Sequence, residues 1–154
     1  MNYQIDKYKI TGKIYVWKFR ENQRNFPGWN LTVNDECAMG LNRLFELMEQ
    51  SEFPSKKSIK TTTPTYNQLR VPNNLNGKAK WESKPTITLN YKKYENENLW
   101  EIIEEDDRIE LRFGTAKMKE LKKGINGIPK GEGDYGICDD QDENIFNFWW
   151  NLEK

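Results

Sequence analysis

The residues best suited to chemistry in this sequence are carboxylates near its C-terminal end. Five of them fall within ten residues and precede an aromatic run: Asp134, Asp139, Asp140, Asp142 and Glu143, then Phe146, Phe148, Trp149 and Trp150. Paired carboxylates can hydrolyse glycosides without histidine, and clustered oxygen ligands suit Ca²⁺. A glycosidase also needs a carboxyl buried against apolar surface, and the spacing lacks the EF-hand pattern and its glycine. The cluster therefore favours binding over catalysis.

The chain contains no histidine, which excludes Ser-His-Asp and Cys-His catalysis and histidine-ligated metals. Its two cysteines, Cys37 and Cys138, lie too far apart for a CxxC metal or redox motif. The glycines between 124 and 131 lack the order of a phosphate-binding loop, and Pro129 removes an amide that a phosphate would need. We therefore expect reduced thiols, no catalytic residue, no metal site and no cofactor.

Charge is unevenly distributed along the chain, although 24 Lys and Arg balance 24 Asp and Glu. Residues 1–93 carry 16 basic and 8 acidic side chains, whereas residues 94–154 carry 8 and 16. Such asymmetry can mark a surface for a charged partner, or it can disappear where both halves share one sheet. Lysines interleaved with aromatics in the basic half suit single-stranded nucleic acid; these aromatics are Tyr15, Trp17, Trp29 and Trp81. No nucleic-acid-binding motif accompanies them, so core packing is the competing interpretation.

Hydrophobic periodicity predicts the elements that must position these residues. Strands are expected over residues 13–19, 29–33, 57–63, 86–91, 99–103, 108–113 and 145–150, with an acidic hairpin tip at 104–107. Asn34 can cap a long helix that runs to about Gln50. Its apolar residues form one stripe: Cys37, Leu41, Leu44, Phe45 and Met48. A shorter, half-exposed helix is expected from Thr115 to Lys123, stopped by Gly124.

This order of elements predicts an α+β fold, with a mostly antiparallel sheet packed against one long and one short helix. The length of 154 residues fits a single domain over residues 1–154, in which residues 65–83 form a long loop or an irregular hairpin. The first dozen residues are expected to be a tail or an edge strand, and no internal repeat is evident. The helix stripe is expected to pack on Tyr15, Trp17, Ile87, Leu89, Ile109 and Leu111.

Two islands of sequence resemble short bacterial proteins of unassigned function. They are Phe26-Pro27-Gly28-Trp29 and Gly131-Glu-Gly-Asp-Tyr135 followed by Phe148-Trp149-Trp150. This resemblance implies a single-domain cytoplasmic protein and lends no catalytic residues. In size and in its acidic C-terminal half, the chain is also similar to bacterial immunity proteins and antitoxins, which block a toxin by covering it.

These observations predict a non-enzymatic, cytoplasmic protein-binding domain, an immunity- or antitoxin-type inhibitor of a basic toxin or enzyme. The absence of a membrane-length apolar run and of a signal-peptide core in the first 30 residues supports that location. The expected partner-binding residues are Asp134, Asp139, Asp140, Asp142, Glu143 and Trp149. The acids would steer the encounter, while Trp149 would lie on the less buried face of the last strand. The alternatives are a nucleic-acid-associated protein that uses the basic half and a carboxylate-based hydrolase.

Overall fold

The computed structural model describes residues 3–20, 28–72, 79–132, 135–141 and 143–151, which form an α+β fold with two sheets rather than one. The five-stranded sheet has the order β4-β1-β2-β9-β8. Its strands are β1 (Ile14–Phe19), β2 (Trp29–Val33), β4 (Trp81–Glu82), β8 (Tyr135–Ile137) and β9 (Phe146–Phe148). The four-stranded sheet has the order β3-β5-β7-β6. Its strands are β3 (Ser55–Lys60), β5 (Thr86–Tyr91), β6 (Trp100–Glu104) and β7 (Arg108–Phe113).

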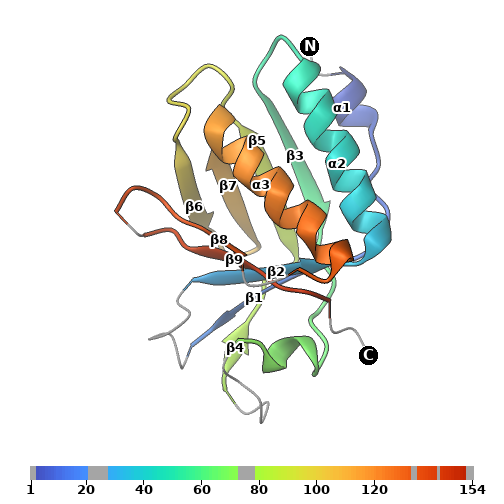
Figure 1. Cartoon of the computed structure of the whole chain (residues 1–154), viewed down its shortest axis with the longest axis vertical. Coiled ribbons are helices and arrows are strands. Elements are labelled where there is room, and N and C mark those ends of the chain that lie inside the picture. Colours follow the sequence, from blue (N-terminus) through green and yellow to red (C-terminus); the bar gives the residue numbers. More distant parts are fainter. Residues whose placement is uncertain (1–2, 21–27, 73–78, 133–134, 142, 152–154) are drawn as a thin grey trace.

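Most neighbouring strands are antiparallel, as expected from the sequence. The exceptions are the pairs β2·β9 and β5·β7, which run parallel. Two helices, α2 (Asp35–Gln50) and α3 (Thr115–Gly127), lie side by side across one face of the four-stranded sheet (Figure 1). None of the helices in the described ranges is long and apolar enough to cross a bilayer.

The long helix α2 confirms its prediction. It begins where the Asn34 side chain accepts a hydrogen bond from the Cys37 backbone N–H at 3.0 Å, and this bond satisfies one of the donors that a helix start leaves unpaired. The whole predicted stripe is buried. The stripe supplies the apolar face through which the helix packs on the sheet.

The prediction for the second helix was wrong about its end. Helix α3 begins after Gly114 and continues through Gly124 to Gly127. A Cβ atom at Gly124 would lie 2.9 Å from a ring carbon of Phe148. The glycine therefore allows strand β9 to approach the helix closely, and it does not terminate the helix. Strand β8 lies beside this contact, since the same Cβ atom would lie 3.0 Å from a ring carbon of Tyr135.

The N-terminal segment was also predicted incorrectly, because it contains the short helix α1 (Tyr3–Lys7) rather than a tail or an edge strand. The Lys57 ammonium of β3 donates hydrogen bonds to the carbonyls of Ile5 and Asp6 at 2.9 and 3.1 Å. These bonds fix the C-terminal end of α1 against the edge of the four-stranded sheet. The side chain of Ile5 is buried in the core.

The topology contains a repeat that the sequence did not reveal. An antiparallel strand pair, a helix and a second antiparallel pair occur in the order β1-β2-α2-β3-β5 and again in the order β6-β7-α3-β8-β9, with η1 and β4 inserted between β3 and β5. We call each of these strand pairs a hairpin. The second hairpin of each half joins the sheet of the other half, through the parallel pairs β5·β7 and β2·β9. Each sheet is therefore built from both halves of the chain.

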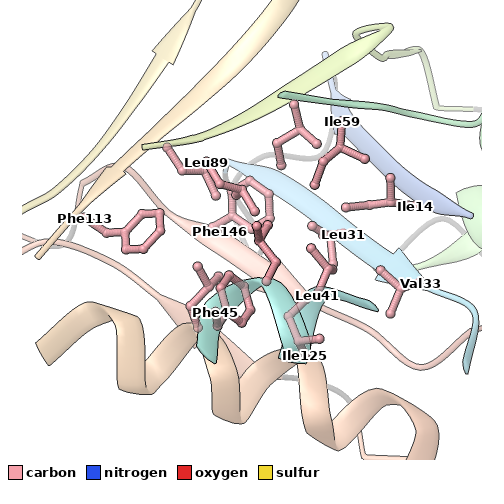
Figure 2. Close-up of a cluster of buried hydrophobic side chains, with 14 of the residues drawn as sticks. Ile14, Leu31, Val33, Leu41, Phe45, Ile59, Leu89, Phe113, Ile125 and Phe146 are labelled. Atoms are coloured by element: carbon pink, nitrogen blue, oxygen red, sulfur yellow. The ribbon is translucent and has the colours of Figure 1, made fainter. Parts of the chain in front are cut away.

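The main core lies between the helices and both sheets (Figure 2). Leu41 and Phe45 of α2 meet Leu89 and Phe113 of the four-stranded sheet there, together with Phe146 of β9. From β1 it is Ile14 and Val16 that enter this core. The prediction that Tyr15 and Trp17 pack under the helix stripe was therefore wrong, because alternation along the strand directs them to the opposite face.

That opposite face of the five-stranded sheet has a second core of its own, which consists of Tyr15, Trp17, Phe19, Leu69, Ala79 and Trp149. The chain between β3 and β5 contributes to it through the 3₁₀ turn η1 (Gln68–Arg70) and neighbouring residues. The Trp17 indole donates a hydrogen bond to the Val71 carbonyl at 3.0 Å. Residues 65–83, expected to be a loop or an irregular hairpin, thus carry η1 and β4, while residues 73–78 lie outside the described residues.

Candidate functional site

A pocket of about 360 Å³ lies where the edge of the four-stranded sheet meets the five-stranded sheet. Four parts of the chain line it: Lys18 of β1, Gly28 and Trp29 at the start of β2, Ile102 and Glu104 of β6, and Glu143, Asn144 and Ile145 ahead of β9. Figure 1 shows the β8–β9 connection reaching past β6 on this side of the molecule. The pocket therefore exists only because the two halves of the chain exchange hairpins.

Three side chains form the polar centre of this pocket. The Trp29 indole N–H donates to Glu104 Oε1 at 2.8 Å, and the Lys18 ammonium lies 3.1 Å from the same oxygen. The ammonium also lies 5.9 Å from the centroid of the Trp29 ring. Trp29 is only 2% exposed although it lines the pocket. Glu104 thus joins a buried aromatic ring to a partly exposed cation.

The connection between β8 and β9 is fastened by Asp139. One of its carboxylate oxygens accepts the backbone N–H groups of Gln141 and Glu143 at 3.0 and 2.7 Å. The other accepts the side-chain amide of Asn144 at 2.9 Å. Hydrogen bonds from Asn144 and from the backbone of Glu143 therefore hold the pKa of Asp139 below its ordinary value. Asp139 organises this turn and does not offer an unoccupied carboxylate to a partner.

Asn144 connects the same turn to β6. Its backbone has a positive φ of 52°, a conformation that asparagine tolerates better than most residues. Its side-chain oxygen accepts the Ile102 N–H at 3.1 Å, and its carbonyl accepts the Trp100 indole N–H at 2.7 Å. These bonds occupy part of the edge of β6 that faces away from β7. Next to it, a Cβ atom at Gly28 would lie 2.2 Å from the Ile145 carbonyl oxygen, so this close approach requires glycine.

The residues predicted as a partner-binding surface have different positions in the structure. Asp140 and Glu143 are exposed, and Glu143 lines the pocket. Asp139 is committed to the turn as described above. Asp134 and Asp142 lie outside the described residues.

Trp149 requires a correction, because it is 4% exposed and belongs to the second core. Its N–H donates to the Leu31 carbonyl, and its indole donates to Asn30 Oδ1 at 2.8 Å. Trp149 directly follows β9 and lies on the face opposite to Phe146 and Phe148, but η1 and its neighbours cover that face. The exposed aromatic at this end is Trp150, which is 37% exposed.

Sequence reasoning missed Lys18, Trp29, Ile102 and Glu104 as parts of one pocket. The usable signal was the acidic hairpin tip, which the structure places at the turn between β6 and β7. The end of β6 and this turn contribute Glu104 to the pocket, and the β8–β9 connection contributes Glu143. Both segments carry further exposed carboxylates. We call this set the acidic rim: Glu104, Glu105, Asp106, Asp107, Asp140 and Glu143.

The chemistry available at the pocket is cation binding. Both partners of Glu104 are donors, which suits a charged acceptor better than an acid that must deliver a proton. Glu143 is exposed, whereas the acid of a glycosidase is held against apolar surface. Within the described ranges, no three His, Cys, Asp or Glu side chains converge on a metal position.

The cysteines and the aromatics of the basic half lie mostly in the interior. Burial, reinforced by Glu36, raises the pKa of the Cys37 thiol to about 12, so this thiol is a poor nucleophile. The described residues show both cysteines outside any disulfide. Trp17 is fully buried, whereas Trp81 is 37% exposed. Of the four aromatics that the sequence pointed to, only Trp81 is therefore exposed enough for a base to stack on it, since Tyr15, Trp17 and Trp29 are buried.

Comparison with protein families, with curated proteins and with solved structures found no match for this chain.

Proposed function

We propose that this protein is a non-enzymatic, cytoplasmic binding domain that inhibits a basic partner protein, in the manner of an immunity protein or antitoxin. The observation that carries this proposal is the convergence of two acidic segments on one pocket. Glu104 and Glu143 are far apart in the sequence, yet both line it. The two thiols fit a reducing compartment.

The acidic rim has the properties expected of a docking surface for a basic protein. Exposed carboxylates raise the rate of encounter with a positively charged partner. Ile102 and Ile145, which are partly exposed, supply apolar surface inside the rim, next to the buried Trp29. A concave apolar centre within a polar border is the arrangement in which a few contacts supply most of the binding energy.

The charges on the edges of the four-stranded sheet also favour one orientation of a basic partner. Its acidic edge strand, β6, lies at the opposite side of the sheet from β3, which carries Lys56, Lys57 and Lys60. The two edge strands of this sheet thus carry charges of opposite sign. A basic partner is attracted to the β6 side and repelled from the β3 side, which orients it before contact.

Affinity capture from extracts of the native host tests this proposal. The bait is compared with a variant that reverses three rim charges without touching the hydrogen bonds of Asp139 or Glu104: Asp106→Lys, Asp140→Lys and Glu143→Lys. A matched control reverses three exposed acids elsewhere: Glu52→Lys, Glu95→Lys and Glu97→Lys. We expect a basic protein to be retained by the wild type and the control and lost from the rim variant.

The captured protein must also lose its own activity when the wild-type chain is added, as an inhibitor requires. Equal retention by the rim variant and the wild type would contradict the proposed surface. A captured partner whose activity is unaffected would contradict the inhibitor role.

A further inference from the structure

We propose that the pocket receives an arginine side chain of the partner and that Lys18 is its built-in substitute in the free protein. This inference rests on the function proposed above and specifies what enters the pocket. The cation position is defined by the structure, since Lys18 holds a positive charge against Glu104 and beside the Trp29 ring. An incoming cation finds the same carboxylate and the same aromatic face once Lys18 moves aside.

The side chain of Lys18 is able to move aside. It is 26% exposed, and the carboxylate that it contacts is 41% exposed. Ion pairs of this exposure are weak, and their long side chains exchange readily with water. Trp29 is instead fixed in the core and held by its hydrogen bond to Glu104. The pocket thus combines a rigid aromatic wall with a replaceable cation.

Guanidinium fits this pocket better than a second ammonium group does. Its planar group stacks on aromatic faces, donates up to five hydrogen bonds and is more weakly hydrated. The volume of about 360 Å³ exceeds what one ammonium group needs. The described residues pair Glu143 with no lysine or arginine, so a guanidinium between Glu104 and Glu143 would satisfy both carboxylates.

The hydrogen-bond arrangement makes Trp29 a direct reporter of this event. Its indole N–H donates to the oxygen of Glu104 that Lys18 contacts. We expect titration of the ¹⁵N-labelled full-length protein with N-acetyl-arginine amide to shift the Trp29 indole resonance, identified by sequential assignment. N-acetyl-citrulline amide, which has nearly the same shape without the charge, is the matched control ligand and should leave it unshifted.

Two variants test the role of each charge. Glu104→Gln keeps an acceptor for the Trp29 indole but removes the negative charge, and we expect it to abolish the arginine-dependent shift. Lys18→Met keeps the aliphatic stem but removes the competing charge, and we expect it to tighten binding of N-acetyl-arginine amide about two- to fivefold. Lys60→Met, on the exposed face of β3, makes the same change in net charge away from the pocket and should leave the affinity unchanged.

The results separate this inference from the proposed function. An unshifted Trp29 resonance, an equal response to citrulline, or weaker binding by Lys18→Met would overturn the arginine pocket, even where a basic partner is captured through the rim. An arginine-specific shift without any captured inhibitor target would leave the pocket chemistry standing and contradict the inhibitor role alone.

Discussion

At the scale of single residues, the same carboxylate chemistry serves two purposes in this protein. Asp139 turns its oxygens toward backbone N–H groups and ties a connection together, whereas Asp140 and Glu143 remain exposed beside it. Composition showed that acids gather here, but it could not assign these roles. The assignment depends on which carboxylate lies within hydrogen-bonding distance of the backbone amides of Gln141 and Glu143, and composition does not give that geometry.

The lowered pKa of Asp139 predicts how the connection responds to acid. A depressed pKa means that the carboxylate orders the turn above the unfolded pKa and that this contribution is lost as pH falls through the lower folded value. As Asp139 takes up a proton, the chemical shift of the Glu143 backbone amide should therefore change, with a midpoint below pH 3.8, the ordinary pKa of aspartate. Amide chemical shifts followed by NMR between neutral and acid pH measure this midpoint.

The control for this titration is Asp139→Ala, in which the amides of Gln141 and Glu143 should show no such step and should exchange with solvent faster. A midpoint at or above 3.8 in the wild type would mean that the hydrogen bonds do not favour the ionised carboxylate.

At the scale of elements, predictions succeeded where local chemistry decides the outcome and failed where a distant contact does. The cap at Asn34 and the apolar period predicted α2 correctly. Gly124 was misread because a glycine in a helical pattern either ends the helix or admits a close neighbour. Here that neighbour is Phe148, which lies in the last strand. Gly124 and Phe148 are far apart in the sequence, so a local pattern could not predict their contact.

The buried stripe of α2 predicts a large effect for Leu44→Ala. Leu44 is fully buried, so the truncation should lower the free energy of unfolding by about 2–5 kcal/mol. Met39→Ala is the matched control on the same helix, because Met39 is 73% exposed and should change the free energy by less than about 0.5 kcal/mol. Urea unfolding measures both, and equal midpoints for the two variants would place the stripe on the wrong face.

Gly40 of α2 and Gly124 of α3 predict effects of opposite sign. At Gly124 an added methyl group meets the Phe148 ring, and overpacking of about 1–3 kcal/mol should outweigh the helix-propensity gain of about 1 kcal/mol. At Gly40 the nearest atom to an added Cβ, on Ile10, lies at 3.4 Å, so Gly40→Ala should stabilise by about 0.5–1 kcal/mol. Thermal unfolding compares them. A stabilising Gly124→Ala would show that β9 does not press on the helix.

At the scale of the whole molecule, the α+β class was predictable and the exchange of hairpins was not. The class follows from the order of helical and strand patterns. The pairing of β2 with β9 joins Trp29 to Phe146, and no pattern within either strand specifies that partner. The pocket depends on this pairing, which is why its residues escaped prediction although the acidic segments around it did not.

The division of charge is also a property of the whole molecule. Three strand spacings separate β3 from β6, a distance of about 14 Å. This exceeds the screening length of about 8–10 Å at physiological salt. A partner close to one edge therefore experiences mainly the charge of that edge. For a basic partner, the charge of the acidic rim should then determine how fast it associates.

The most direct test of this account is the association rate constant of the captured partner, measured at about 20 mM and at high salt. The three reversed rim charges, Asp106→Lys, Asp140→Lys and Glu143→Lys, should slow association at least about tenfold at low salt. The difference from the Glu52→Lys, Glu95→Lys and Glu97→Lys control should shrink as salt is added. A rim variant that stays folded and associates as fast as the wild type at low salt would contradict the assignment of this surface.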